Sequence, residues 1–367
     1  DVYAKACGVN GQRSMVVDLS TTNPDGWEND KHVLVQNQTD ASVWEISVAD
    51  FSSSESSGVS EANRGKYLAF TEEGTTVNGV QGASSTCVDY LKKLGVKYVQ
   101  IMPFYDFGSV DESKNIMDQY NWGYDPVNYN CPEGSYSTNP KKGEVRIKEC
   151  KQMIQALHNA GIGVIMDVVY NHTYTSDSWL QRTVPNYYYR MNNDGTFSNG
   201  SDCSNDTASE HLMFRKYMID SVTYWASEYH IDGFRFDLMG LHDVTTMNSI
   251  RTALDNLYAD GSGSQILMYG EAWDMATNCD EGTVLASQKN LKQLSDRIGA
   301  FDDTIRDAIK GSTGGTDGAF VQEGSRRANL KTGIAGQSDT TTGWANVPSQ
   351  CVTYASCHDN LCLYDKL

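Results

Sequence analysis

The 367-residue sequence lacks a long apolar run, because no stretch approaches the roughly 20 apolar residues that cross a bilayer. Basic residues are scarce: 29 lysines and arginines stand against 47 aspartates and glutamates, and the formal net charge is −18. That charge argues against nucleic acid as a partner, because phosphates would be repelled. Internal repeats and a phosphate-binding glycine loop are also missing. We therefore expect one large soluble domain that acts on neither a membrane nor a nucleic acid.

The nine cysteines are odd in number and lack CxxC or Cys/His metal-ligand spacing. We interpret most of them as buried free thiols, which favours a reducing setting. The scarcity of basic residues and the Ser/Thr/Asn-rich loops favour instead a secreted or cell-surface bacterial protein, with a cytoplasmic location as the alternative. Five histidines fit helices or loops and are interpreted as surface or packing residues: His32, His158, His211, His230 and His242.

What the sequence has is a set of apolar runs that end in carboxylates. The most informative is EYHIDGFRFDLMG at 228–240, where an apolar run stops at Asp237 and Arg235 stands two residues earlier. Side chains alternate along a strand, so these two residues share a face. The cation would keep the carboxylate ionised and hold it still. An ionised, oriented aspartate at a strand end is suited to act as a nucleophile.

The same pattern recurs elsewhere in the chain. The other runs are VKYVQIMPF (96–104), GIGVIMDVVYNH (161–172), SQILMYGEAWD (264–274) and CVTYASCHDN (351–360). Such runs are typical of strands covered on both faces. Their polar residues collect at the C-terminal ends, which is the edge where parallel α/β barrels build their active sites.

Amphipathic segments alternate with these runs and predict a parallel α/β architecture. We expect helices over 83–94, with Gly95 as a cap, and over 144–160, 210–229 and 244–258. We expect strands near 43–51, 97–104, 162–169, 232–238, 265–271, 297–301 and 351–357. These seven strands are one short of a closed eight-stranded barrel. The Gly/Ser/Thr-rich segment 311–343 is long for a loop, and a short helix is expected around Arg326–Leu330.

Several motifs resemble those of the α-amylase superfamily, glycoside hydrolase family 13, and within it the type I pullulanases. DVVYNH (167–172), GFRFDLMG (233–240), YGEAWD (269–274) and SCHDN (356–360) match the four catalytic regions of that family in order and spacing. YNWGYDP (120–126) matches the heptapeptide of the pullulanase subgroup. The resemblance implies a (β/α)8 TIM barrel over 41–367, preceded at 1–40 by the junction to an N-terminal β-sandwich. It also implies that the eighth strand and the C-terminal domain are absent. Three explanations follow: another chain or fragment supplies the missing barrel segment, the sequence is a truncated piece, or something else fills the gap.

The resemblance assigns roles to individual residues. Asp237 matches the nucleophile, Glu271 the general acid and base, and Asp359 the third acid, which binds sugar hydroxyls. Glu271 should then be less solvated than Asp237. The residues expected to bind or orient the substrate are Arg235, His172, His358, Tyr124, Asp125, Trp122, Trp273 and Met239. Asp167 is interpreted as structural, and no metal or cofactor is required. Asn171 is a candidate calcium ligand, although a loop hydrogen bond is favoured.

The resemblance implies a retaining hydrolase that cleaves α-1,6 branch linkages in pullulan, amylopectin and related α-glucans. An α-1,4-acting amylase or amylopullulanase is the first alternative. A non-catalytic glucan-binding barrel is the second, and the three intact acids argue against it. Because an open barrel exposes two sheet edges, we expect residues 1–367 alone to be unstable and nearly inactive.

Overall fold

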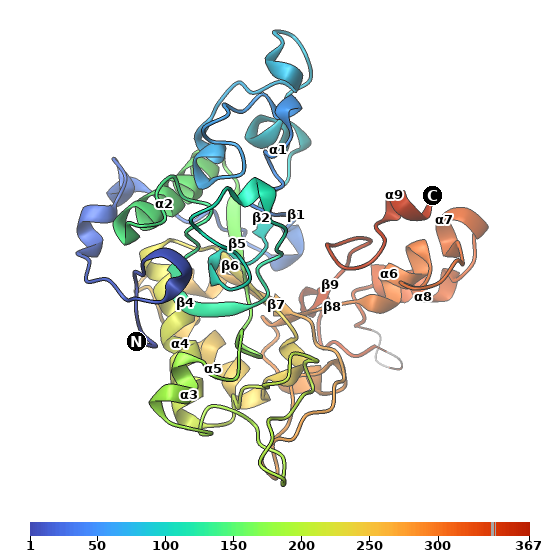
Figure 1. Cartoon of the computed structure of the whole chain (residues 1–367). Helices are drawn as coiled ribbons and strands as arrows, with labels where there is room; N and C mark the ends of the chain where they lie inside the picture. Colours follow the sequence, from blue (N-terminus) through green and yellow to red (C-terminus); the bar gives the residue numbers. More distant parts are fainter. Residues whose placement is uncertain (339–340, 342) are drawn as a thin grey trace.

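A curled sheet of seven parallel strands forms the centre of the protein (Figure 1). The structure is a computed structural model that describes residues 1–338, 341 and 343–367. The strand order is β1-β2-β5-β6-β7-β8-β9, so consecutive parallel strands are neighbours. Their bounds are Val43–Ile46, Tyr98–Ile101, Gly163–Val168, Gly233–Phe236, Leu267–Gly270, Gly299–Phe301 and Cys351–Val352. This arrangement confirms the seven predicted strands and the incomplete (β/α)8 barrel.

Each strand is shorter than the apolar run that predicted it. The sheet ladder of β6 ends at Phe236, and Asp237 follows it; the ladder of β7 ends at Gly270, and Glu271 follows it. These two carboxylates therefore lie just beyond the last strand residue, at the carboxyl edge of the sheet, whereas Asp167 lies inside β5, one residue before its end. The strands themselves are covered on both faces, and every residue of β2, β5, β6 and β7 is buried. This agrees with the continuous apolar runs.

The four predicted helices are present as α1 (Cys87–Leu94), α2 (Gly143–Asn159), α4 (Leu212–Glu228) and α5 (Val244–Asp255). Gly95 ends α1 in the left-handed conformation with a φ of 80°, as expected for a glycine cap. The region after β8 contains three helices where one was expected: α6 (Asp303–Lys310), α7 (Ala319–Glu323) and α8 (Arg327–Ile334). Two short helices, α3 (Trp179–Thr183) and α9 (Leu363–Lys366), were not predicted.

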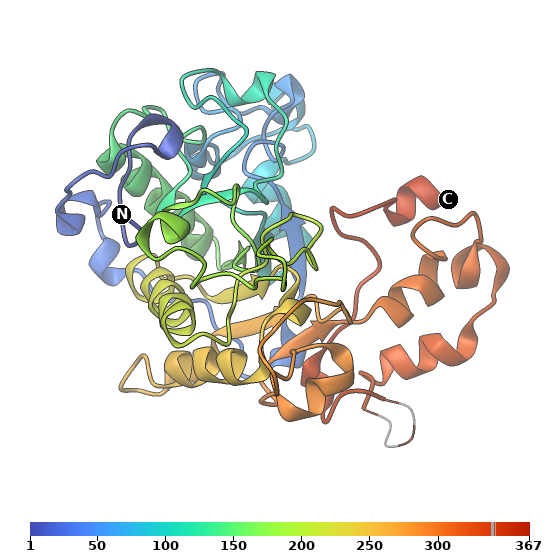
Figure 2. The same cartoon turned by 60° about the horizontal axis from the view of Figure 1, so that its bottom comes forward.

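A two-stranded antiparallel sheet, also not predicted, is inserted between β2 and α2. It pairs β3 (Tyr105–Phe107) with β4 (Pro126–Pro132), and the YNWGYDP segment leads into β4. Figures 1 and 2 both show the orange and red segment that contains α6 to α9 gathered on one side of the molecule, and in Figure 1 α2 lies on the opposite side. In the described part of the chain, β1 and β9 each pair with a strand on one side only.

A buried network of ion pairs connects Asp30 and His32, in the N-terminal segment, to residues of the barrel. His158 on α2 lies 2.8 Å from Asp232 and 2.9 Å from Asp30, through its two ring nitrogens. His32 and His230 bind the same two carboxylates at 3.1 and 2.7 Å. The expectation that these histidines are surface or packing residues is therefore wrong for His158, which carries a buried ion pair.

Two sequence expectations concern thiols and membranes. All nine cysteines are free thiols, but only Cys7, Cys87, Cys131 and Cys150 are buried, so the expectation that most are buried is wrong. Within the described residues, no helix combines the length and apolarity that a membrane span requires.

Candidate active site

Arg235 lies at the centre of the site and binds three carboxylates. The register of β5 and β6 places Asp167 directly opposite Arg235. Arg235 Nη1 donates to Asp167 Oδ1 at 3.0 Å and to Asp237 Oδ1 at 2.8 Å. Its Nη2 lies 2.7 Å from Glu271 Oε1. Side chains at the carboxyl ends of β5, β6 and β7 therefore converge on one guanidinium, and Arg235 is 2% exposed.

The two principal carboxylates differ in their surroundings. Asp237 receives hydrogen bonds on both oxygens, from Arg235 on one and from Asn171 Nδ2, at 2.8 Å, on the other. Glu271 receives Arg235 on one oxygen and the backbone N–H of Leu238, at 3.0 Å, on the other. Burial raises the pKa of Glu271, and the charge of Arg235 opposes that rise. Glu271 is also the less exposed side chain, at 7% against 12% for Asp237, which confirms the expected order of solvation.

A strained turn places Glu271 beside the end of β6. Leu238 has a φ of 41°, in the left-handed region, and the following residues form a single helical turn. A Cβ atom at Gly240 would lie 2.0 Å from the carbonyl oxygen of Trp273, so only glycine fits there. Gly240 N–H also donates to the carbonyl of Glu271 at 2.8 Å. The turn after β6 thus holds the backbone of Glu271, which follows β7, in a fixed position.

Asp167 and Asn171 are buried residues that hold the catalytic groups by hydrogen bonds: Asp167 binds Arg235, and Asn171 binds Asp237. Asp167 is fully buried and accepts a 2.6 Å hydrogen bond from the hydroxyl of Tyr124. Burial raises the pKa of Asp167 to about 7, although Arg235 lowers it. The amide oxygen of Asn171 lies 2.6 Å from His172 Nδ1, and its nitrogen faces Asp237. Both ends of the Asn171 amide have protein partners, in agreement with the favoured hydrogen-bonding role.

A second group of predicted residues surrounds His358. Its ring lies 5.0 Å from that of Tyr124, stacked, and 5.1 Å from that of Trp122, edge to face. Asp359 follows it, with a side chain that is 47% exposed and an oxygen 3.7 Å from His358 Nε2. Asp359 is close enough for its charge to contribute to the raised pKa of Glu271. The third acid thus lies at the open rim of the site.

The sequence reasoning did not identify Glu45, which holds His358 in place. Its carboxylate accepts the backbone N–H of His358 at 2.6 Å and contacts His358 Nδ1 at 2.8 Å. Glu45 belongs to β1, in the run VWEI, so it follows the same pattern of a carboxylate in an apolar strand. A search for carboxylates in apolar strands would therefore have identified Glu45.

The remaining predicted residues occupy different surroundings. His172 is buried, with Nε2 2.8 Å from the carbonyl of Tyr124. Asp125 is half-buried, and burial raises its pKa to about 6. Trp273 is half-buried against the cluster around Tyr269. Met239 is fully buried in the main core, so it packs beneath the site and offers no surface to a ligand, contrary to expectation.

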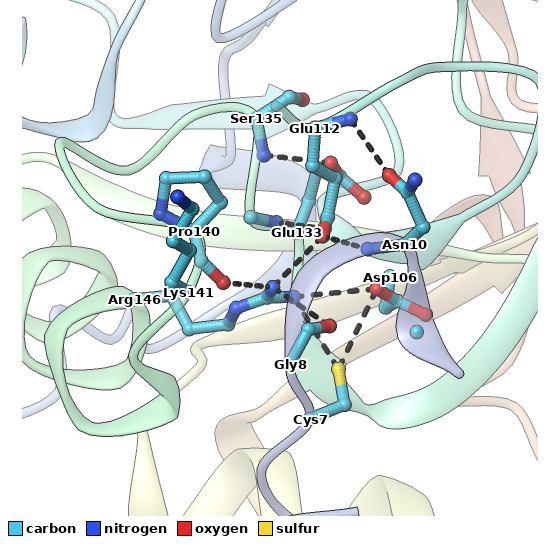
Figure 3. Close-up of polar contacts among 12 residues, drawn as sticks. Cys7, Gly8, Asn10, Asp106, Glu112, Glu133, Ser135, Pro140, Lys141 and Arg146 are labelled. Atoms are coloured by element: carbon cyan, nitrogen blue, oxygen red, sulfur yellow. Dashed lines mark hydrogen bonds and ion pairs between the residues drawn. The ribbon is translucent and has the colours of Figure 1, made fainter. Parts of the chain in front are cut away.

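A separate cluster of three buried carboxylates, Asp106, Glu112 and Glu133, has the composition of a metal site (Figure 3). Arg146 lies among them, 3.3 Å from Asp106 and 2.9 Å from Glu112. All six carboxylate oxygens accept hydrogen bonds from the protein; the donors are Cys7, Asn10, Arg146, Asn128, Gly134, Ser135 and Phe107. A cation would have to displace these donors, so the cluster does not fit a metal. It joins the N-terminal segment to the β3–β4 insertion and α2.

Comparison with known proteins agrees with the fold. Residues 49–202 match the family described as alpha amylase, catalytic domain. The whole chain aligns with a pullulanase of Bacillus subtilis at 40% identity, and it covers 49% of that protein. It aligns with the chloroplastic pullulanase 1 of Arabidopsis thaliana at 32% identity and covers 46% of it. The chain thus spans about half the length of these relatives.

Solved structures also show similarity to pullulanases, again over about half the length of each relative. A pullulanase from Paenibacillus barengoltzii, in complex with maltohexaose and α-cyclodextrin, superposes with a TM-score of 0.93 at 45% identity; all of this chain and 56% of that one are covered. A pullulanase from an Anoxybacillus species, in complex with maltotriose, gives a TM-score of 0.91 at 42% identity, with 100% and 50% covered.

The fold and the site define a class: parallel α/β-barrel proteins with a carboxylate pair at the carboxyl ends of adjacent strands. Within that class the chain is similar to the α-amylase family, whose catalytic-domain model matches residues 49–202, and the relatives described above are pullulanases.

Proposed function

We propose that the protein is a retaining glycoside hydrolase that cleaves α-1,6 linkages in pullulan, amylopectin and related α-glucans. The observation that carries this proposal is the shared guanidinium of Arg235, which binds Asp237 through one nitrogen and Glu271 through the other. A retaining mechanism needs two carboxyl groups about 5–5.5 Å apart, with one ionised and one protonated. Burial raises the pKa of Glu271, which favours its role as the acid, while Asp237 accepts hydrogen bonds from Arg235 and Asn171 that hold it in place.

In the first step the carboxylate of Asp237 attacks the anomeric carbon, and Glu271 gives its proton to the departing glycosidic oxygen. A covalent glycosyl ester on Asp237 results. In the second step Glu271, now ionised, removes a proton from water as that water attacks the same carbon; the bond from that carbon to Asp237 breaks, which releases the sugar and restores the Asp237 carboxylate and the protonated Glu271. Asp359, at the rim, would bind the hydroxyls of the sugar. No step needs a cofactor, because protein side chains supply the nucleophile, the acid and the base.

The linkage is tested by digesting pullulan with the complete polypeptide that carries this chain. Maltotriose as the product supports α-1,6 cleavage, and panose would show the α-1,4 cleavage of the alternative. The relatives' complexes with maltohexaose and maltotriose favour an α-glucan ligand in either case. A non-catalytic glucan-binding barrel would release neither product. Dialysis against a chelator is expected to leave the activity unchanged.

The free edges of β1 and β9 suggest how the barrel is completed. We propose that a further parallel strand, from the same polypeptide or from another chain, pairs with these edges and closes the barrel. In the described residues both edges are open, and such edges invite pairing with another strand. Residues 1–367 produced alone should therefore show little activity and a low unfolding midpoint. Full turnover by that fragment would contradict this part of the proposal.

A further inference from the structure

A second cleft, with a volume of about 460 Å³, lies beside the β3–β4 insertion, and none of the three proposed catalytic acids lines it. Its lining includes Gln12, Phe107, Tyr174, Asp177, Trp179 and Arg182. We call it the Tyr174 cleft. Its volume falls within the range of about 300–1,000 Å³ that is usual for small-ligand sites.

The segment 121–126 separates the Tyr174 cleft from the catalytic carboxylates. On the catalytic side, the hydroxyl of Tyr124 reaches Asp167. On the cleft side, the backbone N–H of Gly108 donates to the carbonyl of Asp125 at 2.8 Å, and that of Tyr174 donates to Pro126 at 2.9 Å. The wall between the two sites is therefore backbone held by hydrogen bonds. A ligand in the Tyr174 cleft would not occupy the position of the reacting sugar.

The ring of Tyr174 is supported from below and open to solvent. A Cβ atom at Gly108 would lie 2.5 Å from two carbons of this ring, so any larger residue at 108 would push the ring away. Gly108 thus lets the ring rest against the backbone. Tyr174 is nevertheless 45% exposed, which is a large open area for an aromatic side chain in a cleft. An aromatic ring held in this way can stack with a flat apolar surface.

Trp179 and a charged pair complete the Tyr174 cleft. The guanidinium carbon of Arg182 lies 5.0 Å from the centre of the Trp179 ring. Arg182 also binds Asp177 through two parallel hydrogen bonds of 2.9 and 2.6 Å. The exposed fractions of these two side chains are 54% and 69%, so their remaining donors and acceptors face solvent. The pair has no net charge, which suits a neutral ligand that offers hydroxyl groups.

We propose that the Tyr174 cleft is a second α-glucan-binding site, which holds a maltooligosaccharide segment of the polymer apart from the bond being cleaved. The choice of glucan rests on the proposed function. A glucose ring has a face of C–H groups, which would stack on Tyr174, and a rim of hydroxyls, which would bind the Asp177–Arg182 pair. A phosphorylated ligand fits poorly, because the charged side chains that line the cleft, Asp111, Asp177 and Arg182, leave it with an excess of one negative charge.

Two sites on one polymer act together, because binding at the first raises the effective concentration at the second. The Tyr174 cleft should therefore matter for amylopectin and much less for a short branched oligosaccharide. We would compare Tyr174→Ala and Trp179→Ala, singly and combined, in a Glu271→Gln background that prevents hydrolysis. The measurement is retardation in native gels that contain amylopectin. Loss of aromatic stacking should weaken binding about tenfold, which corresponds to about 1.4 kcal/mol.

Tyr90→Ala is the matched control, because Tyr90 is 43% exposed on α1 and does not line the Tyr174 cleft. It should leave retardation unchanged. With Glu271 intact, the cleft variants should hydrolyse the short oligosaccharide with unchanged kcat/KM. If Trp179→Ala does not fold, the Tyr174→Ala variant alone tests the second site. Tyr174 is 45% exposed, so its removal should leave the fold intact.

The outcomes separate this inference from the proposed function. Undiminished retardation of the folded Tyr174→Ala variant would overturn the second site, whatever the enzyme cleaves. Reduced retardation of the cleft variants would support the second site. If the unmodified protein then released no product from pullulan, the site would stand and the proposed reaction would fail.

Discussion

The Nη2 atom of Arg235 lies 2.7 Å from Oε1 of Glu271, while Nη1 of the same guanidinium lies 2.8 Å from Oδ1 of Asp237. One cation thus influences both the group that we expect to be protonated and the group that we expect to be ionised. Because the guanidinium is rigid, it also sets the distance between the two carboxylates. The difference in their roles must then come from burial, which is the largest influence on the pKa of Glu271.

Glu271→Gln should lower kcat on pullulan by about 10²–10⁴-fold, the usual contribution of a positioned acid or base. The amide keeps the shape and can still accept the hydrogen bond from Leu238, so glucan affinity should survive. Initial rates and gel retardation would be measured on the same preparation. Glu281→Gln, an exposed neighbour in the same region, is the control and should be silent. Retained turnover in Glu271→Gln would remove this residue from the mechanism.

The pH profile should report the proton on Glu271. A general acid must be protonated to act, so kcat/KM should fall as pH rises through its pKa, which burial places above the ordinary value. Asp167 is the competing group, because burial raises its pKa to about 7. Asp167→Asn removes that titration while retaining an acceptor for Tyr124. The basic limb should persist in Asp167→Asn; its disappearance would assign the limb to Asp167.

Arg146→Met should destabilise the fold strongly. It leaves Asp106 and Glu112 buried without the cation that binds them, and breaking such a pair costs about 3–5 kcal/mol. Burial already raises the pKa of Glu133 to about 8, so charge in this cluster is hard to accommodate. The loss, measured by urea unfolding, should shrink at low pH, where the carboxylates bind protons. Lys216→Met breaks an exposed pair on α4 and should cost under about 1 kcal/mol. Equal losses in the two variants would contradict the structural role of Arg146.

Features of the site that depend on residues close together in the sequence could be predicted, whereas contacts between residues far apart in the sequence could not. Asp237 and Glu271 were found because each closes a local apolar run, and a parallel barrel brings such ends to one edge. Asp167 lies inside its run and was interpreted as structural. Arg235 was predicted to hold Asp237, since the two are close in sequence. Arg235 also binds Asp167 and Glu271. These contacts depend on the register of β5, β6 and β7, which could not be predicted from the sequence.

Other features depend on contacts that no local pattern records. The β3–β4 pairing contains register shifts at each step, so it lacks the regular alternation that marks a strand pair. Arg146 contacts Cys7, 139 residues away in the chain, and its helix position looks like that of any amphipathic helix. Met239 follows Asp237 in the motif, but the tight turn at Leu238 directs it into the core. Proximity to a catalytic residue in sequence was misleading there.

His158 supports a prediction about stability and pH. Its contacts with Asp232 and Asp30 raise its pKa to about 10, against an ordinary value of about 6.5, despite burial. A group whose pKa is raised by folding stabilises the fold fully below its unfolded value, and that contribution disappears as pH rises through the folded value. The stabilisation should thus be complete below about pH 6.5 and lost by about pH 10. The pKa of Asp30 is lowered to about 2, so its contribution is complete above about pH 4 and is lost as pH falls toward 2. Both contributions are therefore complete between about pH 4 and pH 6.5.

His158→Asn should therefore cost about 3–5 kcal/mol near pH 6 and progressively less toward pH 10, where the wild-type ring also becomes neutral. Urea midpoints at several pH values would measure the difference. His32 and His230 face the same carboxylates and remain in the variant, so the comparison isolates one ring. His211→Asn, whose partner Asp280 is 68% exposed, should cost under about 1 kcal/mol. A loss in His158→Asn that is the same at pH 6 and pH 10 would show that the ring acts by packing and not by charge.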